Sequence, residues 1–393
     1  MENQTLELAS EFVDLLFSVL PNDKMLPLHE PDFFGNEQKY LADCVKSGWV
    51  SSVGKYVDQF EADLANFTGA SNVVVVVNGT AALHIALIIA GVKRDDEVLV
   101  PAMSFVATAN AVSHAGAIPN FVDVSQDTLG MCPKKLKDYL KCSTEQTSGG
   151  IRNKDSKRFL SAIVPMHTFG NPSEIDKICE IGLEFGIPVV EDAAEALGSY
   201  YKGRHLGTFG EIGVLSFNGN KIITTGGGGA LLFNDPDLSA YAKHLTTTAK
   251  VPHPWNFYHD RVGWNYRMPN INAALGCAQL ESINQKLHNK KILMKRYKKA
   301  FEASKNFKFF ASKLSCNQNN WLNAVLLNNP SNTLKEAIIE KAVSRGFGVR
   351  PAWNLLNSLP MYEECPSDNL SASKMLFDSI INVPSSPQLI DFG

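Results

Sequence analysis

Three stretches of the chain combine residue types that could do chemistry together. "NGT" (78–80) follows a run of valines, "ED" (191–192) ends the apolar run "IPVV", and Lys221 stands between "VLSF" and the glycines 226–229. The first stretch could bind an anion, the second could neutralise a buried cation, and a lysine with a neutral amine can act as a nucleophile. Each stretch also has an ordinary structural explanation.

For residues 78–80, both explanations start from a strand that runs directly into a helix. Backbone N–H groups and the Thr80 hydroxyl at the positive helix end would form a phosphate site around Gly79. A simple helix cap explains the same residues, because Asn and Thr are common there. This stretch alone leaves both open.

Glu191 and Asp192 end an apolar strand where ligands gather in open α/β sheets. A carboxylate buried there needs a hydrogen-bonding or charged partner, and a protonated ring nitrogen would be suitable. The alternative is a helix cap at Asp192. On spacing alone, Lys221 could equally be a surface lysine. An anion site, a strand-end carboxylate and a lysine in one α/β domain are, however, the parts that bind pyridoxal 5′-phosphate.

The elements that must position these residues alternate between short β-branched runs and helical patterns. Strands that are apolar on both faces and separated by helices indicate an α/β domain with a mostly parallel sheet. The predicted strands lie within 73–77, 97–100, 118–124, 159–166 and 187–192, and two adjacent ones lie within 212–217 and 229–233.

The remaining patterns suggest a second domain and its connections. We expect a polar surface loop over 141–158, one long helix from about 272 to 303, and a smaller C-terminal α/β unit after about residue 305. The predicted division is an N-terminal helical arm (1–35), a large cofactor-binding domain (36–270), and the connecting helix with the small domain (271–393).

Composition excludes several classes of protein. The 393 residues carry a net charge of -3, which argues against a nucleic-acid binder. The seven cysteines include no C-x-x-C pair, so we expect neither a metal site nor a disulfide framework, and a cytoplasmic location. No apolar run is long enough for a membrane span.

Several motifs in fixed order carry a resemblance to a known family. "NGTAAL", "PAMSFVATANAV", "EDAAEALGSYYKGRHLGTFGEIGVLSFNGNKIITTGGGG" and "GWNYRMPNINAALGCAQLE" resemble the DegT-type (DegT/DnrJ/EryC/StrS) nucleotide-sugar aminotransferases. The resemblance runs from about 26 to 387. It implies the fold-type I architecture of aspartate aminotransferase, pyridoxal 5′-phosphate as cofactor, and a homodimer with shared active sites.

The resemblance also implies roles for single residues. Lys221 would bind the cofactor covalently, and Asp192 would pair with its ring nitrogen. The other implied cofactor contacts are Gly79, Thr80 and Ser216 at the phosphate, Phe105 stacked on the ring, and Asn265 reaching the phosphate of the neighbouring subunit. Glu195 stands where many relatives have His or Gln, and Asn218 where many have His. Position in the motif order makes Lys55, Arg350 and Trp353 candidates for substrate binding, with a loop turn or a core tryptophan as alternatives.

The substrate follows from the branch that the motifs resemble. "LPLHEPDFFGNEQKYLADCVKSGWVSSVGKYVDQFE" looks like the subgroup that aminates C4 of a UDP-linked 2-acetamido-2,6-dideoxy-4-keto-hexose, for bacillosamine or legionaminic-acid sugars of surface glycans. Glutamate would donate the amino group in a ping-pong reaction. GDP-perosamine synthases and dTDP-4-keto-sugar aminotransferases are the alternatives, and outside catalysis a sensor or a nucleotide-binding scaffold with the same fold.

Overall fold

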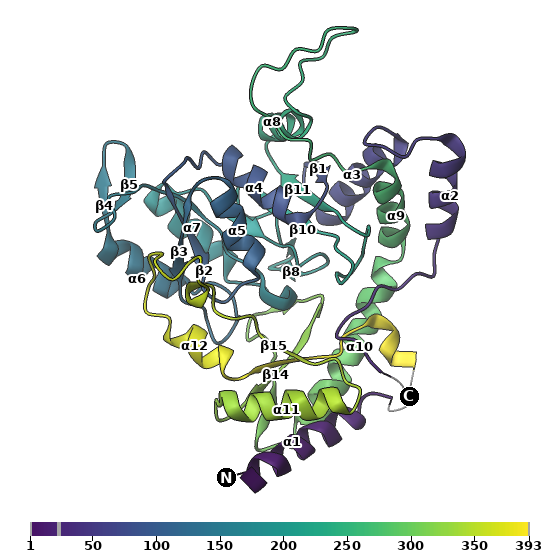
Figure 1. Cartoon of the computed structure of the whole chain (residues 1–393), viewed down its shortest axis with the longest axis vertical. Coiled ribbons are helices and arrows are strands. Elements are labelled where there is room, and N and C mark those ends of the chain that lie inside the picture. The colour runs from purple at the N-terminus through teal and green to yellow at the C-terminus, as the bar shows by residue number, and fades with distance from the viewer. Residues whose placement is uncertain (1, 22–24, 392–393) are drawn as a thin grey trace.

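A mostly parallel sheet is the centre of the large domain in this computed structural model, which describes residues 2–21 and 25–391 (Figure 1). The hydrogen-bonded strand orders are β3-β2-β6 and β1-β11-β10-β7. Parallel bridges Ile163–Val189 and Met166–Asp192 place β6 beside β7, which joins both groups. The strands are β1 (Asn72–Val76), β2 (Glu97–Pro101), β3 (Ile118–Val122), β6 (Leu160–Ile163), β7 (Val190–Asp192), β10 (Ile212–Ser216) and β11 (Gly229–Phe233).

Both faces of this sheet are buried, as the apolar strands predict. Within β2, Leu99 packs into the core on one face and Val98 and Val100 into the core on the other. Strand β11 runs antiparallel to β1 and β10, so the predicted adjacency of 212–217 and 229–233 is confirmed. The covering helices are α3 (Lys55–Thr68), α4 (Gly79–Ile89), α5 (Val106–His114), α6 (Pro133–Ser143), α7 (Ile175–Phe185) and α8 (Pro236–Thr246).

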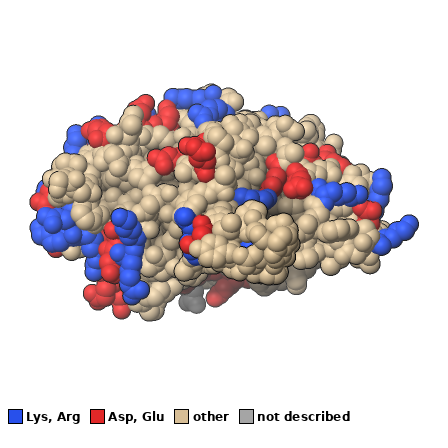
Figure 2. All heavy atoms as spheres, turned by 90° about the horizontal axis from the view of Figure 1, so that it is seen from above, with Lys and Arg blue, Asp and Glu red and all other residues tan. Residues whose placement is uncertain are grey.

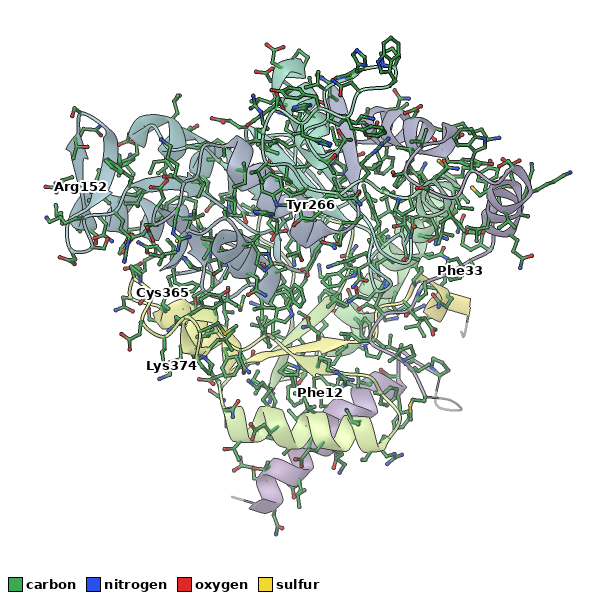
Figure 3. All side chains as sticks on the ribbon, turned by 45° about the horizontal axis from the view of Figure 1, so that its top comes forward. Phe12, Phe33, Arg152, Tyr266, Cys365 and Lys374 are labelled. Atoms are coloured by element: carbon green, nitrogen blue, oxygen red, sulfur yellow. The ribbon has the colours of Figure 1, made fainter. Side chains whose placement is uncertain are left out.

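The small domain is an antiparallel sheet covered by helices. Its strand order is β12 (Phe307–Phe309), β14 (Asn323–Leu327), β16 (Ile380–Val383) and β15 (Arg350–Pro351). Helix α1 (Glu2–Phe17) packs along α11 (Asn332–Ser344), and the buried Phe12 lies between α1 and the sheet (Figure 3). The aromatic rings of Phe12 and Phe307 are 5.1 Å apart. The N-terminal helix therefore belongs to this core, whereas the predicted boundaries at 35 and 270 stay a prediction.

Two predicted elements differ from the structure. The expected surface loop over 141–158 contains a hairpin of β4 (Thr144–Thr147) and β5 (Gly150–Asn153). The Asn153 amide anchors it by donating to Glu97 Oε2 at 2.9 Å, a pairing between distant residues. The predicted helix 272–303 is divided into α9 (Asn270–Glu281) and α10 (Ile283–Phe301). It breaks at Ser282, whose hydroxyl donates to the Gln279 carbonyl and competes with helical hydrogen bonding.

The remaining elements connect the two domains. A ribbon of order β13-β8-β9 joins a small-domain strand to two strands of the large domain. These elements are α2 (Glu37–Ser47), β8 (Tyr200–Tyr201), β9 (Arg204–His205), β13 (Cys316–Asn317), α12 (Ser371–Phe377), and the short 3-10 turns η1 (Thr168–Gly170), η2 (Leu356–Ser358) and η3 (Pro387–Asp391).

The surface carries charges of both signs. Seen from above, Lys and Arg side chains are interspersed with Asp and Glu, with uncharged surface between them (Figure 2). Among the helices of residues 2–21 and 25–391, none is long and apolar enough to cross a membrane.

Candidate active site

Lys221 lies in a turn that follows β10. Its backbone N–H donates to the Asn218 carbonyl at 3.0 Å, and the neighbouring Phe217 is fully buried. The Lys221 ammonium is 3.3 Å from Glu195 Oε1 and 4.0 Å from the centre of the Trp321 ring. Only 12% of the side chain is exposed. Lys221 is therefore not a surface lysine, and its amine is positioned between a carboxylate and an aromatic ring.

Glu195 is held beside this amine by the backbone. Its second oxygen, Oε2, accepts the Phe169 N–H at 2.8 Å, and Phe169 adopts a left-handed φ of 57°, which is uncommon for a residue other than glycine. Burial raises the pKa of Glu195 to about 7 against the effect of the nearby Lys221. The fold therefore places a carboxyl of raised pKa within hydrogen-bonding distance of the Lys221 amine.

Asp192 ends β7 in a buried polar cluster. Its Oδ2 accepts the Thr108 hydroxyl at 2.7 Å, and its Oδ1 accepts the Ala194 N–H at 3.2 Å. Ser104 contacts Thr108 in turn, with 2.7 Å between the two hydroxyl oxygens. Burial raises the pKa of Asp192, and among the described side chains no basic group forms an ion pair with it. The carboxylate can thus take a cationic N–H from a ligand.

The start of α4 meets the end of β10. Asn78 caps the helix, because its side-chain oxygen accepts the Ala81 N–H at 2.8 Å. The cap explanation is therefore confirmed for Asn78, but the first N–H groups, those of Gly79 and Thr80, have no acceptor within the helix. A Cβ atom at Gly79 would lie 2.9 Å from the Ser216 Cβ. Glycine thus permits a close approach that brings the first N–H groups of α4 next to Ser216 at the end of β10.

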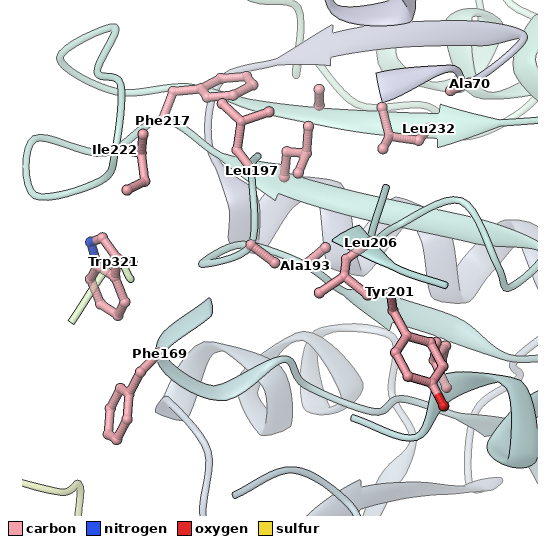
Figure 4. Close-up of a cluster of buried hydrophobic side chains, with 14 of the residues drawn as sticks. Ala70, Phe169, Ala193, Leu197, Tyr201, Leu206, Phe217, Ile222, Leu232 and Trp321 are labelled. Carbon is pink, nitrogen blue, oxygen red and sulfur yellow. The ribbon is translucent and has the colours of Figure 1, made fainter. Parts of the chain in front are cut away.

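A cavity of about 400 Å³ opens beside the lysine. Arg350 and Trp353 line it together with Trp321, whose indole N–H donates to the Asn220 carbonyl. Phe105 lies next to it, with its ring 6.1 Å from that of Trp353. In Figure 4, Trp321 lies below Ile222 of the turn that follows Phe217, and Phe169 lies below Trp321 on the same side of the core. Two candidate substrate residues and one candidate cofactor residue therefore gather near Lys221.

Three predicted residues lie outside this group within the single chain. Lys55 pairs with Asp43 at 2.8 Å and lines a different cavity of about 510 Å³. Asn265 is exposed, and its backbone pairs with Thr247 at the base of the loop that projects beyond α8 (Figure 1). Asn218 is exposed, and its backbone carbonyl accepts the Lys221 N–H.

His167 has a structural role. It is fully buried, and its Nε2 lies 3.0 Å from Glu191 Oε2. Its Nδ1 accepts the Ser173 N–H at 3.2 Å, so both ring nitrogens are satisfied. Glu191 also accepts the N–H groups of Gly207, Phe209 and Gly210, which explains its burial without a ligand.

Sequence reasoning missed two residues of the site. Thr108 stands in a quoted motif, but nothing marks one threonine of a helix as a partner of Asp192. Trp321 comes from the small domain, far along the chain from Lys221, and no local pattern connects them.

The comparisons with known proteins decide the family. The model described as "DegT/DnrJ/EryC1/StrS aminotransferase family" matches residues 32–391. The chain belongs to this family. It is 34% identical to a putative pyridoxal phosphate-dependent aminotransferase, EpsN, of Bacillus subtilis, over 94% of this chain and 92% of the relative. It is 32% identical to the GDP-perosamine synthase of Vibrio cholerae, over 93% of this chain and 95% of that protein.

Solved structures agree with this family. The aminotransferase TlmJ of Streptoalloteichus hindustanus superposes with a TM-score of 0.83, at 26% identity over 92% of this chain and 93% of that chain. The predicted fold-type I architecture is thereby confirmed, and family membership confirms the predicted aminotransferase and its cofactor, pyridoxal 5′-phosphate.

The described residues fit this cofactor. It needs a phosphate site, a partner for its ring nitrogen and a lysine. The close approach of Gly79 to Ser216, the buried Asp192 without an ion-pair partner, and the shielded amine of Lys221 supply these groups. The roles of the single residues are part of the proposal below.

Proposed function

We propose that the protein transfers the amino group of glutamate to C4 of a UDP-linked 2-acetamido-2,6-dideoxy-4-keto-hexose. The observation that carries this proposal is the amine of Lys221, 3.3 Å from Glu195 and beside a cavity of about 400 Å³. Membership of a family of sugar aminotransferases supports the reaction class. The product would be a 4-amino sugar nucleotide for surface glycans.

The chain's own groups would divide the work between binding and proton transfer. Lys221 would hold the cofactor covalently, and Asp192 would keep its ring nitrogen protonated. When bound, the cofactor supplies an electron sink for the reacting carbon, and it carries the amino group from the first half reaction to the second. The amine of Lys221 would carry a proton between the reacting carbons, and Glu195, whose pKa burial raises to about 7, would hold that amine in place as its hydrogen-bond partner.

Binding would use the surrounding groups. Gly79, Thr80 and Ser216 would hold the phosphate by their N–H and hydroxyl groups, and Phe105 would stack on the ring. Arg350 and Trp353 would contact the sugar nucleotide.

A homodimer is part of the same proposal. The loop between α8 and α9 exposes four large apolar side chains, those of Trp255, Phe257, Tyr258 and Val262. Contiguous exposed apolar surface is typical of protein interfaces. A partner covering this loop would place Asn265 near the partner's phosphate site, and Lys55 near its substrate. Sedimentation velocity tests this, because removal of the apolar loop side chains should yield monomers.

A cytoplasmic location also belongs to the proposal. All seven cysteines are free, which fits a reducing compartment.

GDP-perosamine synthesis is a second candidate. Relatives with that name are 32% and 33% identical to this chain over 93% of its length, which favours GDP as an alternative nucleotide.

One assay tests substrate and reaction together. Purified protein with added cofactor is incubated with glutamate and with UDP-, GDP- and dTDP-linked 4-keto-6-deoxy sugars, and NMR identifies the product. We expect a 4-amino product from the UDP-linked 2-acetamido sugar, and no product from the Lys221→Ala variant. The proposal would be contradicted if none of the sugars gave a glutamate-dependent product, or if the Lys221→Ala variant turned over.

A further inference from the structure

The cavity beside Lys221 contains polar groups that the proposed mechanism does not use. It is lined by His29, Phe169, Trp321, Arg350, Trp353 and Asn382, among others. His29 comes from the segment before α2, and Asn382 from the middle of β16. Asn220, which precedes Lys221, lines this cavity, and the Lys221 ammonium lies 4.0 Å from the centre of the ring of Trp321, another lining residue. The cavity therefore lies next to the lysine turn.

Two of these groups are shielded from solvent and have no hydrogen-bond partner. Both ring nitrogens of His29 are buried without a partner, and so is the side-chain oxygen of Asn382. Only 3% of Asn382 is exposed. Unsatisfied buried polar groups are rare in native proteins, because each loses its hydrogen bonds to water without replacement. Two such groups lining one cavity indicate a ligand that pairs with them.

The protonation state of His29 limits the chemistry of that ligand. Burial, followed by the charges of Lys290, Lys221 and Lys286, lowers the pKa of His29 well below its usual value. The ammonium groups of Lys290 and Lys286 are themselves occupied by acceptors, among them the carbonyls of Trp321 and Asp32. A neutral imidazole offers one donor and one acceptor, and the Asn382 oxygen is an acceptor.

A hydroxyl group complements this set, whereas a carboxylate does not. A hydroxyl can both donate and accept, so neighbouring hydroxyl or amide groups would satisfy His29 and Asn382 together. A carboxylate only accepts and would leave two acceptors unpaired. The walls suit the same ligand, because the contacting rings of Trp353 and Phe169, with centres 5.1 Å apart, form an apolar wall of a cavity that also has a few polar groups.

We propose that this cavity binds the hexose ring of the substrate, and that His29 with Asn382 recognises its hydroxyl or amide groups. His29 is then a specificity-determining residue for the sugar. This inference rests on the proposed function, since it assigns the sugar of that substrate to a place.

Calorimetry separates the sugar from the nucleotide. Binding of UDP-N-acetylglucosamine, GDP-mannose and dTDP-glucose is compared with binding of UDP, GDP and dTDP. We expect wild-type protein to bind one sugar nucleotide about 10-fold more tightly than its free nucleotide, and His29→Ala to lose that difference. His29→Gln, which retains a donor and an acceptor, should recover part of it, and His288→Ala, at an exposed histidine of α10, should match wild type.

The reaction with glutamate provides a second readout. On adding glutamate, the rate of the absorbance change of the bound cofactor should fall less in His29→Ala than the affinity for the sugar nucleotide does. An equal loss of the glutamate reaction and of sugar-nucleotide affinity in His29→Ala, or an unchanged preference for the sugar nucleotide, would overturn the inference and leave the proposed function in place. Wild-type protein that reacts with glutamate but binds none of the sugar nucleotides would overturn both.

Discussion

The clearest quantitative prediction concerns the buried carboxyl of Glu195. Its pKa rises from 4.5 to about 7, so the folded protein binds a proton there more tightly than the unfolded chain does. Ionisation of the buried carboxyl costs the folded state no stability below pH 4.5. The loss of stability grows as the pH rises from 4.5 to 7 and is complete above pH 7. Since a difference of one in pKa corresponds to about 1.4 kcal/mol, the folded state loses roughly 3 kcal/mol between pH 4.5 and 8.

Glu195→Gln removes this pH dependence, because an amide does not ionise. We expect the free energy of unfolding of the variant, relative to wild type, to increase by roughly 3 kcal/mol between pH 4.5 and 8. Urea unfolding of the cofactor-free proteins at equal concentration measures it. Glu180→Gln is the matched control, because Glu180 is exposed on α7.

The result that would refute this reasoning is a constant difference between Glu195→Gln and wild type across the pH range. It would mean that the carboxylate of Glu195 is as well stabilised in the fold as in water.

Three further substitutions probe the cofactor site and the small domain. Asp192→Asn should lower turnover about 100-fold in steady-state assays with glutamate, because an amide cannot keep the cofactor ring nitrogen protonated, and unchanged turnover would exclude that role. Gly79→Ala should raise the dissociation constant of the cofactor about 10-fold in equilibrium dialysis, because its Cβ would lie 2.9 Å from that of Ser216; wild-type affinity would argue against a phosphate site there. Phe12→Ala should cost about 3–5 kcal/mol in denaturant unfolding, whereas Leu6→Ala, at a side chain 53% exposed, should cost little, and equal losses would contradict the packing.

The sequence predicts the parts of the site that lie at strand ends. Lys221, Asp192 and Gly79 are each marked by a short local pattern, and the parallel sheet brings strand ends to one edge. The paired strands around the lysine turn could be predicted for the same reason, since both are apolar and only a glycine-rich connection separates them.

The groups that surround the lysine could not be predicted in this way. Trp321 and His29 come from segments outside the large sheet, and their approach to Lys221 depends on how the two domains pack. No periodic pattern in the sequence encodes the side-chain hydrogen bond of Ser282 at the helix break, or the strand pairing and the contact with Glu97 that form the hairpin over 144–153.

The central claim is that Lys221 binds the cofactor covalently and releases it from this bond when glutamate reacts. Protein loaded with pyridoxal 5′-phosphate is reduced with borohydride, with and without prior addition of glutamate, and the labelled peptide is identified by mass spectrometry. We predict a pyridoxyl phosphate label on Lys221 alone, its loss after glutamate, and no label in a folded Lys221→Ala variant. A label on another lysine would contradict the account, and Lys286 and Lys290, whose pKa values burial lowers, are the lysines to compare.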